Sequence, residues 1–592
     1  MDIFTYPVDS KQLLRKKLRI KKELLSQNIS FIEKRVAVLG GSTTNEIVDQ
    51  LELFLLNYGI KPTFYQSEYA QYWQDAVFGN EELDSFQPDI VFIHTNWRNI
   101  TAFPTTASTV EEANQLLDDQ FAHFSVMWDK IAERYACPVI QNNFDRPAWR
   151  LLGNSDISDY RGKTNFISRL NQKLYDYAQG HKGFYVNDID YLAANYGLEK
   201  WSNPLYWHMY KYSLCLDAIP SLAKSVADII KSIYGKNKKV LVCDLDNTLW
   251  GGVVGDDGVE GIQVGPEVPT GQIYSEFQSY VKELKSIGVL LAVNSKNDEE
   301  NAIAGLNHPD GVLKPDDFVN IKANWENKDR NMQAIAAELN LGIDSFVFID
   351  DNPTEREIMR QADFGVAIPE MDKVENYIRI LDNNGYFEVT SLSADDLSRV
   401  KMYQENAKRT QLQQSLGSYE DFLKSLEMKA TIRNFEPIYI QRIAQLTNKS
   451  NQFNLTTLRC SESDITHMKD SPDYLCLYGK LEDKFGDNGV VSVVAGERIG
   501  DELHMRLWLM SCRVLKRGME DAMLDTLVSD ARQIGIKTIK GYYYPTAKNN
   551  MVRDFYQRMG FTLESADETG NTVWTLDVAT YVPKHPSIEI TR

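Results

Sequence analysis

Two aspartates spaced two residues apart, Asp244 and Asp246, are the side chains of this sequence best placed to do chemistry. They follow a short apolar run, residues 240–243, whose pattern predicts a buried parallel strand. Open α/β sheets bind ligands at the carboxyl ends of their strands, and residues i and i+2 lie on the same side of a strand. Because two carboxylates held that close repel each other unless a cation or a shared proton lies between them, the pair predicts a divalent metal site.

Polar side chains also follow two further predicted strands, residues 289–293 and 346–349, and begin a predicted helix. Parallel strands end at a common edge of a sheet, so we expect these groups to lie beside the aspartate pair. A plain surface ion-pair network is the alternative, but it would leave several carboxylates converging without partners. The groups are Asn294, Ser295, Lys328, Asp350, Asp351 and Asn352.

Residues 244–248, Ser295, Lys328 and the pair at 350–351, in this order, resemble the four motifs of the haloacid dehalogenase (HAD) superfamily over about 236–385. The resemblance implies phosphoryl transfer with Mg²⁺, in which Asp244 is the nucleophile and forms an aspartyl-phosphate. It makes Asp246 the general acid and base, and it makes Lys328 the cation that neutralises the phosphate, with Lys322 as the competing candidate. Ser295 would bind the phosphoryl oxygens, and the metal ligands would be Asp244, the backbone carbonyl of Asp246, and Asp350 or Asp351. We expect substrate contacts from Thr248, Asn294 and Asn352.

The segments between these motifs are short. Residues 248–272 have room only for a small flap, which the glycines there predict to be a β-hairpin, and residues 295–328 are too few for a folded insertion. Many HAD enzymes carry a cap domain at one of these points. An open site suits a bulky substrate, such as a protein-tethered group, or a lid supplied by another domain.

The region before this domain, residues 31–235, shows strand–helix alternation typical of a flavodoxin-like α/β layer. Ser42, Asn96 and His208 stand in an order that resembles the SGNH hydrolase superfamily. That family has an aspartate before the serine, where this chain has Gly41. It has another aspartate three residues before the histidine, where this chain has Leu205. We therefore expect a vestigial hydrolase site in a domain used for binding or assembly. Residues 1–30 form a basic leader helix, either packed on this domain or docking an acidic carrier protein or a membrane surface.

The last region, residues 391–592, resembles the GNAT acyltransferase fold in the order of its elements. In that family the loop before the central helix holds the pyrophosphate of coenzyme A. Residues 511–518 form the corresponding loop, in which a lysine replaces the first glycine of the family pattern. The alternatives are a pantetheine-binding loop and a GNAT-shaped domain without an acyl donor. The loop residues in question are Arg513, Lys516, Arg517 and Gly518.

The order of the three domains, an α/β layer, a capless HAD domain and a GNAT-like domain, resembles the FkbH-like family over nearly the whole chain. Residues 38–44, 243–251 and 451–457 look like its signatures. The resemblance implies dephosphorylation coupled to loading a glyceryl group from an acyl phosphate onto an acyl carrier protein. The alternatives are a stand-alone phosphatase acting on a sugar or glycan-linked phosphate and a non-enzymatic scaffold. Cys243 is an alternative acyl acceptor, although strand alternation directs it away from Asp244.

The composition is that of an ordinary globular protein of several domains. The chain has 592 residues and a formal net charge of −19, which argues against nucleic acid as a general partner. Its 6 cysteines are scattered without a Cys-x-x-Cys pair, which suits a reducing compartment. No run of about 18 apolar residues occurs. We therefore expect a cytoplasmic, multidomain α/β protein without a transmembrane segment.

Overall fold

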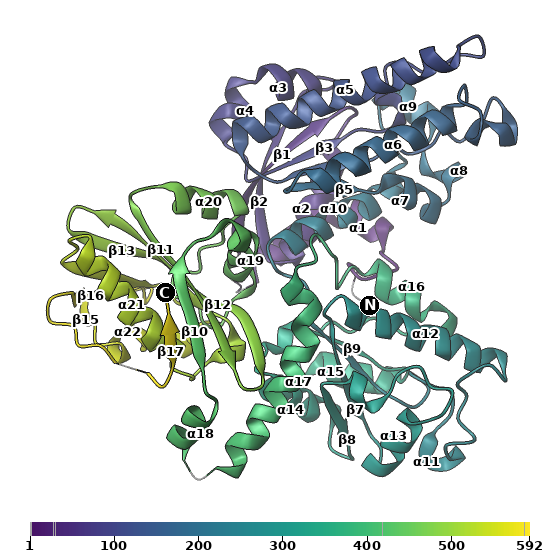
Figure 1. Cartoon of the computed structure of the whole chain (residues 1–592). Helices are drawn as coiled ribbons and strands as arrows, with labels where there is room; N and C mark the ends of the chain where they lie inside the picture. The colour runs from purple at the N-terminus through teal and green to yellow at the C-terminus, as the bar shows by residue number, and fades with distance from the viewer. Residues whose placement is uncertain (1–2, 28, 30, 417, 547, 585) are drawn as a thin grey trace. The chain divides into compact units, whose positions relative to one another are not determined.

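The structure, a computed structural model, describes residues 3–27, 29, 31–416, 418–546, 548–584 and 586–592. The chain divides into two compact units, Met1–Ile233 and Tyr234–Arg592. The first unit contains a five-stranded sheet, and the second contains a four-stranded and an eight-stranded sheet (Figure 1). The expected multidomain α/β class with parallel sheets is thus confirmed. The regions expected at 236–390 and 391–592 lie together in the second unit.

The sheet of the first unit consists of β1 (Ile32–Gly40), β2 (Ile60–Gln66), β3 (Ile90–His94), β4 (Val139–Asn142) and β5 (Phe184–Asn187). All strands are parallel, and their order is β2-β1-β3-β4-β5, which is the flavodoxin-like order. We did not expect β2. It contains Pro62 and alternates buried with exposed residues, as an edge strand can, whereas the strands predicted from the sequence are apolar runs.

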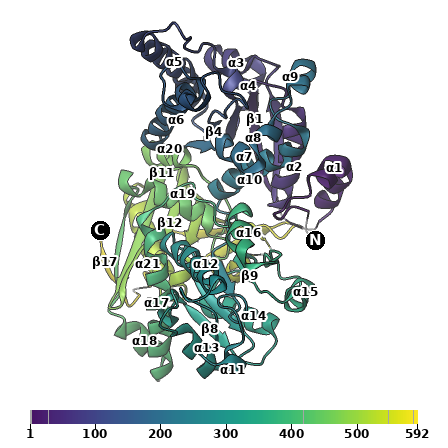
Figure 2. The same ribbon diagram turned by 90° about the vertical axis from the view of Figure 1, so that its right-hand side faces the viewer.

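Helices cover both faces of this sheet. α5 (Val110–Tyr135) and α6 (Lys163–Gly180) lie on one side, and α2 (Asn45–Asn57) and α10 (Ile219–Ile233) lie on the other (Figure 2). Their apolar residues and those of the strands form the core of the unit. The shorter helices are α3 (Tyr72–Phe78), α4 (Glu81–Phe86), α7 (Ile189–Tyr196), α8 (Leu198–Trp201) and α9 (Pro204–Tyr210).

The basic leader segment forms α1 (Ser10–Leu25), which packs on α2. Its buried residues are Leu13, Ile20 and Leu24, spaced for one helical face. Lys17 pairs with Glu46 and Asp49 of α2 at 2.9 and 2.6 Å. The helix is therefore part of the first unit; residues 1, 2, 28 and 30 of the expected leader lie outside the described residues.

A buried ion cluster lies on α10. Asp228 accepts hydrogen bonds from Lys224 at 2.6 Å, Lys231 at 2.7 Å and the Tyr58 hydroxyl at 2.7 Å. Burial acts to raise the pKa of Asp228, but the two lysines outweigh it, and the pKa lies below its ordinary value. The cluster therefore stabilises the fold above the unfolded-state pKa of about 3.9, and this contribution is lost as the pH falls through the lower pKa of the folded state.

We expect Asp228→Asn to lower the free energy of unfolding of the first unit by about 3–5 kcal/mol, because it removes the buried carboxylate that accepts from both lysines. Denaturant-dependent hydrogen exchange of the α10 amides measures this local stability. Glu133→Gln is the matched control, since it breaks a pair with Lys130 that is exposed, and it should change stability by less than about 1 kcal/mol. Equal effects of the two substitutions would contradict the assignment.

The four-stranded sheet of the second unit consists of β6 (Val240–Cys243), β7 (Leu290–Ser295), β8 (Asn320–Ala323) and β9 (Phe346–Ile349). The strands are parallel in the order β8-β7-β6-β9; β6, β7 and β9 are fully buried, and all their residues except Asn294 and Ser295 are apolar. β6 lies between β7 and β9, so the residues that follow these three strands meet at one edge. The helices around this sheet are α12 (Pro269–Ser286), α13 (Glu299–Leu306), α14 (Lys328–Leu339), α15 (Pro353–Gln361) and α16 (Tyr377–Asn383).

The flap after β6 is not the simple β-hairpin we expected. A single antiparallel bridge joins Gly251 to Gln263, and between them lies the short helix α11 (Val254–Asp257). Asp257 accepts a hydrogen bond from the Val253 backbone N–H at 2.8 Å, and Asp246 accepts one from the Val254 N–H at 2.9 Å. These carboxylates satisfy N–H groups at the start of the helix, which favours a helical turn here.

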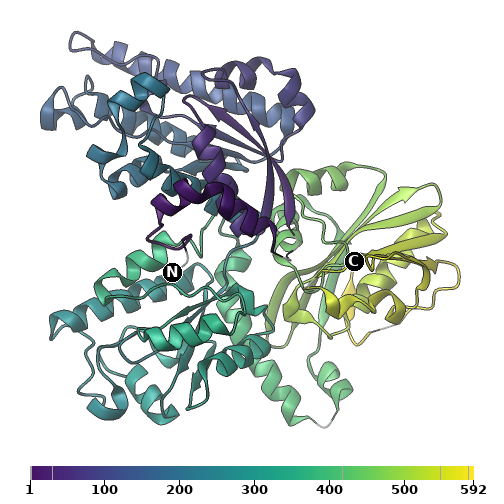
Figure 3. The same cartoon turned by 180° about the vertical axis from the view of Figure 1, so that it is seen from behind.

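The eight-stranded sheet has the order β15-β16-β14-β13-β12-β11-β10-β17. Its members are β10 (Lys429–Asn434), β11 (Tyr474–Asp483), β12 (Gly486–Ile499), β13 (Glu502–Met510), β14 (Thr538–Tyr543), β15 (Thr562–Ala566), β16 (Thr572–Asp577) and β17 (Glu589–Thr591). β17 pairs with β10, which brings the C-terminus to this sheet (Figure 3).

Helices pack on both faces of the large sheet and form two apolar clusters. α21 (Met519–Gln533) covers one face, and α19 (Ile440–Lys449) and α20 (Glu462–Asp470) cover the other. The segment 549–559 forms a single 3₁₀ turn followed by the short helix α22 (Phe555–Arg558). The remaining helices are α17 (Ala394–Ser415) and α18 (Tyr419–Ser425). Among the described residues, no helix combines the length and the apolarity needed to span a bilayer.

Candidate active site

Three carboxylates and one lysine converge at the carboxyl edge of the four-stranded sheet. Oxygens of Asp244, Asp350 and Asp351 all lie within 4.8 Å of one another. Lys328, the first residue of α14, places Nζ 2.9 Å from Asp244 Oδ1 and 2.5 Å from Asp350 Oδ2. Asp244, Asp350 and Lys328 are buried. The sheet therefore brings together residues that are more than 100 positions apart in the sequence, as their positions after strands predicted.

The cluster carries more negative than positive charge. Burial, together with the nearby Asp244, raises the pKa of Asp350 to about 6. The same two causes raise the pKa of Asp351. Burial acts to lower the pKa of Lys328, but Asp244 and Asp350 outweigh it and raise the pKa, so the lysine stays charged. The charge of one ammonium group does not balance three carboxylates, so a further cation would stabilise the cluster.

Asp246 is held by donors on both of its oxygens. Oδ1 accepts from the Trp250 indole N–H and from the Val254 N–H, each at 2.9 Å, and Oδ2 accepts from Asn297 Nδ2 at 2.9 Å. Burial is the main cause that raises its pKa. We had not singled out Trp250 or Asn297. A donor four residues after Asp246 and an amide two residues after Ser295 are the signals that could have found them.

The three residues expected to contact substrate make hydrogen bonds within the site, and their substrate contacts stay a prediction. Thr248 is fully buried, and its hydroxyl accepts a hydrogen bond from the Asp351 N–H at 3.1 Å. Asn294 donates to the Lys328 carbonyl at 2.8 Å, and Asn352 caps α15 by accepting from the Thr354 N–H at 2.9 Å. Their contacts therefore fix the positions of the reactive groups.

Ser295 and Lys328 are both buried, whereas the competing lysine, Lys322, has its partner elsewhere. Ser295 ends β7 and is buried at the same edge of the sheet as Asp244. Lys322, the competitor of Lys328, lies on β8 and pairs with Glu338 at 2.6 Å. Of the two lysines, Lys328 is thus the one in contact with the carboxylates.

The N-terminal part of the chain, residues 35–231, matches the family model described as "FkbH, N-terminal domain". A solved structure, the N-terminal part of protein BF1531 from Bacteroides fragilis, is 31% identical, with a TM-score of 0.59. The match covers 63% of this chain and 99% of that one. The chain belongs to the FkbH-like family. The B. fragilis protein is described as containing a phosphatase domain and was crystallised in complex with Mg.

Other solved structures match a smaller part of this FkbH-like chain. The ribosomal-protein-S18-alanine N-acetyltransferase from Escherichia coli is 14% identical, with 26% of this chain and 97% of that chain covered and a TM-score of 0.21. The GNAT domain of PAT from S. lividans is 19% identical, with 25% and 89% covered and a TM-score of 0.21. Similarities this low support no conclusion about function. No curated protein matches the sequence.

In the first unit of the FkbH-like chain, Ser42, Asn96 and His208 do not form a hydrolase site. Ser42 Oγ donates to Ser213 Oγ at 3.1 Å, and the Asn96 side chain accepts from the Arg98 N–H at 2.9 Å. His208 is exposed on α9 and, within the described residues, makes no hydrogen bond to either of them. The serine therefore lacks the base that a Ser–His hydrolase needs.

A different histidine, His94 at the end of β3, lies in this region. Its Nδ1 accepts from Asn142 Nδ2 at 2.9 Å, and Asn187 donates to Asn142 Oδ1, which fixes the amide orientation. His94 Nε2 must then carry the proton and donate to Ser213 Oγ at 2.9 Å. Burial lowers the pKa of His94 to about 4. A neutral imidazole that already donates from Nε2 cannot take a proton there, so this network is structural.

In the second unit, both arginines of the loop between β13 and α21 contact other residues of the protein. Arg517 is buried and donates to Asp483 at 3.2 Å and to Asn406 at 3.0 Å, and Arg513 contacts Met402 and the Asn488 carbonyl. Lys516 is exposed. Gly518 caps α21 with a φ of +83°, a conformation that favours glycine. Lys516 is thus the loop cation most accessible to a ligand.

The gap that opens between β13 and β14 is filled by the chain itself. The two strands pair only from Glu502 to His504 of β13. Beyond that point Leu455 donates to the Trp508 carbonyl at 3.1 Å and accepts from the Tyr544 N–H at 2.9 Å. Residues 453–457 therefore bridge the two strand edges, and no extended ligand can pair with those backbone groups.

Proposed function

We propose that the second unit is a Mg²⁺-dependent, HAD-type phosphohydrolase or phosphotransferase that works through an aspartyl-phosphate on Asp244. The observation that carries the proposal is the convergence of Asp244, Asp350 and Asp351 on Lys328. The related protein from B. fragilis, with its phosphatase domain and bound Mg, supports it.

The residues of the site fit a magnesium ion. Mg²⁺ prefers oxygen ligands, and here three carboxylates meet with a single lysine to balance them. The carboxylates of Asp244 and of Asp350 or Asp351, with the backbone carbonyl of Asp246, would hold the ion. When bound, it would neutralise charge on the phosphoryl oxygens and on these carboxylates. The raised pKa of Asp350 agrees with this, because a cation would favour its charged form.

Asp244 would act as the nucleophile. Lys328 contacts its Oδ1 and so holds a positive charge beside the attacking group. A bond forms between a carboxylate oxygen and phosphorus while the bond from phosphorus to the leaving oxygen breaks. Lys328 also faces the place where negative charge accumulates, so it would stabilise the transition state.

Asp246 would move the proton in both steps. It protonates the leaving oxygen in the first step, and in the second it takes a proton from the water that attacks phosphorus and releases Asp244. Burial raises its pKa, so a larger fraction of Asp246 carries the proton to be donated than for an exposed aspartate. Its bonds to Trp250 and Asn297 fix the carboxyl group in one orientation.

We further propose that this chemistry is coupled to loading a glyceryl-type acyl group, taken from an acyl phosphate, onto an acyl carrier protein. Membership of the FkbH-like family supports this. So do the short connections around the site: α11 lies in residues 248–268, and α13 and β8 lie in residues 296–327, so neither segment forms a cap domain. The runner-up is a stand-alone phosphatase on a sugar or glycan-linked phosphate, favoured by the internal use of Arg513 and Arg517.

Incubation with 1,3-bisphosphoglycerate, Mg²⁺ and candidate holo-acyl carrier proteins tests the coupling. We expect phosphate release together with a glyceryl mass increase on the carrier, both abolished by a chelator. Phosphate release without any carrier modification would favour the stand-alone phosphatase. If neither occurs with this substrate or with sugar phosphates, the phosphatase proposal itself is wrong.

The lysine assignment has its own test. Lys328→Met should lower the rate of phosphate release by about 10²–10³-fold, because it removes a buried cation that faces the reacting phosphate. Lys322→Met removes a lysine that pairs with Glu338 instead, so its rate should stay within about threefold of the wild type. Steady-state kinetics on both variants decide the matter, and a larger loss for the second variant would reverse the assignment.

A further inference from the structure

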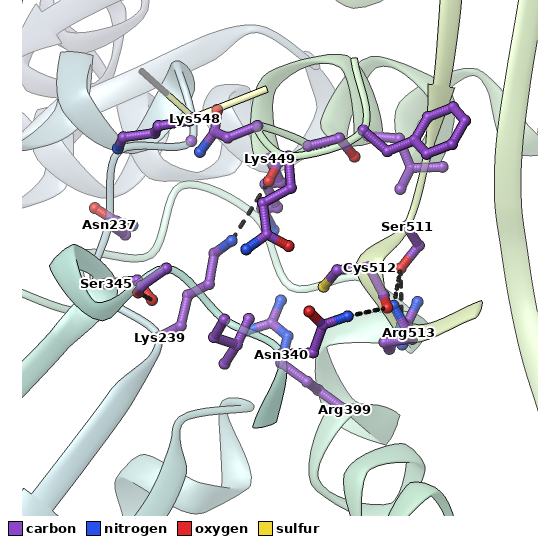
Figure 4. Close-up of a pocket in the computed structure, with 18 of the residues that line it drawn as sticks. Asn237, Lys239, Asn340, Ser345, Arg399, Lys449, Ser511, Cys512, Arg513 and Lys548 are labelled. Atoms are coloured by element: carbon purple, nitrogen blue, oxygen red, sulfur yellow. Dashed lines mark hydrogen bonds between the residues drawn. The ribbon is translucent and has the colours of Figure 1, made fainter. Parts of the chain in front are cut away.

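A cavity of about 390 Å³ lies in the second unit (Figure 4). Part of its wall comes from the amino-terminal edge of the four-stranded sheet. Lys239 precedes β6, Leu290 begins β7, and Ser345 precedes β9. Asp244 and Asp350 follow the opposite ends of these parallel strands. The cavity and the carboxylate cluster therefore lie at opposite edges of one sheet.

The rest of the wall belongs to the eight-stranded sheet and its helices. α19 contributes its C-terminal turn with Lys449, and residues 450–453 continue from it. The end of β13 and the following turn contribute Ser511, Cys512 and Arg513. α17 contributes residues 395, 399 and 403. The cavity is thus the place where the two sheets of this unit adjoin, and its volume is that of a small-molecule site.

The lining is strongly basic in a chain whose net charge is −19. Seven of the lining residues are lysine or arginine, and two are aspartate, Asp344 and Asp395. Cations held so close together repel one another, and they normally avoid burial unless anions accompany them. The basic residues are Lys236, Lys239, Arg399, Arg442, Lys449, Arg513 and Lys548.

The acids available nearby do not balance this charge. Asp344 pairs with Lys548, and Asp395 pairs with Arg442 at 2.8 Å. Lys449 shares Asp396, which lies behind the wall, with Arg399. Within the described part of the chain, Lys236 and Lys239 have no carboxylate at ion-pair distance.

The titration of the lysines agrees with this imbalance. Burial is the first cause that lowers the pKa of Lys236 to about 8 and that of Lys449 to about 8, and other cations add to it. Burial lowers the pKa of Lys239 as well. Among the residues that the structure describes, the one hydrogen-bond acceptor of Lys239 Nζ is the Lys449 carbonyl, at a long 3.4 Å. A bound anion would reverse the effect of burial at all three lysines.

Apolar side chains form one part of the remaining lining, among them Leu290, Leu341, Leu446, Phe453 and Met510, and uncharged polar side chains such as Asn237, Ser345 and Gln452 form another. A ligand that matches both surfaces has an anionic head and a carbon body. Phosphate fits the head best, since it carries up to two charges and accepts several charge-assisted hydrogen bonds from lysine and arginine. We propose that this cavity is a binding site for a small organic phosphate, separate from the phosphatase centre. The proposal does not depend on the proposed function.

Phenylphosphonate is a suitable probe, because its carbon–phosphorus bond resists phosphatases. The full chain, kept in a chelator so that the metal site is unloaded, is titrated with the probe by calorimetry. In parallel, the alkylation of Cys512 by iodoacetamide is followed by peptide mass spectrometry. Cys512 lines the cavity and is half-buried, whereas Cys215 is half-buried in the first unit and serves as the internal reference. We expect the probe to slow alkylation of Cys512 at least fivefold and to leave Cys215 unchanged.

Three variants locate the binding. Lys239→Gln combined with Lys449→Gln should weaken binding about tenfold or more and remove the protection of Cys512, because two charged donors are lost. Lys537→Gln, on the surface of the same unit with 78% of its side chain exposed, should bind like the wild type. Lys328→Met should retain the protection, since it alters only the opposite edge of the sheet.

Each contrary result would overturn the proposal. Unprotected Cys512 in the wild-type chain at saturating probe would show that the cavity does not bind it, whatever the folding of the variants. Protection that survives in the double variant, or that benzyl alcohol reproduces, would show that the lysines do not recognise the anion. Loss of protection in Lys328→Met would assign the binding to the carboxylate cluster instead.

Discussion

Asp244→Asn should abolish phosphate release, with a rate loss of about 10⁴-fold or more. An asparagine amide cannot attack phosphorus as a carboxylate does, so the covalent route is removed and not merely slowed. The substitution changes one atom and keeps the side-chain volume. Lys328 would still contact Asp350 at 2.5 Å, so we expect the fold to persist. Phosphate release under saturating Mg²⁺ measures the effect, and circular dichroism checks the fold.

The matched control for this variant is Asp256→Asn. Asp256 is an exposed aspartate of α11, in the flap that follows β6, and it lies outside the carboxylate cluster. Its substitution removes one negative charge near the site without touching the reacting groups, so activity should stay within about threefold. Substantial residual activity in Asp244→Asn, above that of a metal-free blank, would exclude a nucleophilic role for this residue.

Asp246→Asn should lower the rate by about 10²–10⁴-fold, the usual range for loss of a general acid and base. The Asn oxygen can still accept from Trp250 and Val254, so the side chain should keep its orientation. The change therefore removes the titrating proton and the acceptor of the Asn297 amide. Steady-state kinetics on two substrates measures it.

The leaving group distinguishes proton transfer from simple disturbance of the site. An alkyl phosphate needs protonation of its leaving oxygen, whereas p-nitrophenyl phosphate has a stable leaving anion that needs little help. The loss in Asp246→Asn should be larger for the alkyl phosphate in the step that forms the aspartyl-phosphate. Equal losses in single-turnover measurements on both substrates would show that Asp246 is not the general acid.

The sequence predicted the reactive groups of the four-stranded sheet because each follows or begins a local pattern. Asp244 and Asp350 follow apolar runs, and Lys328 begins an apolar-periodic helix. Parallel pairing of β6 with β7 and β9 then brings the ends of these elements to one edge without further information. For a site at the end of parallel strands, the order of strands and helices along the chain therefore predicts which side chains meet.

Other features depend on contacts that no local pattern encodes. His208 was chosen by its order in the chain, but the buried partner of the Ser42 region is His94, joined through Ser213. The edge strand β2 lacks a continuous apolar run because one of its faces is exposed. The sequence did not predict the basic cavity, because its lining comes from separate stretches between residues 235 and 548. In each stretch alone, the charged residues have the pattern of an ordinary solvated surface.

The most direct test of the central claim is to observe the phosphorylated aspartate. Asp246→Asn lacks the base that activates water, so with Mg²⁺ and a phosphate ester that has a good leaving group it should accumulate the covalent intermediate. Acid quenching followed by peptide mass spectrometry should find one phosphoryl group on Asp244, and none when Asp244→Asn is added to the variant. Rapid turnover with no phosphoryl group on Asp244, or a phosphoryl group on another residue, would contradict the account.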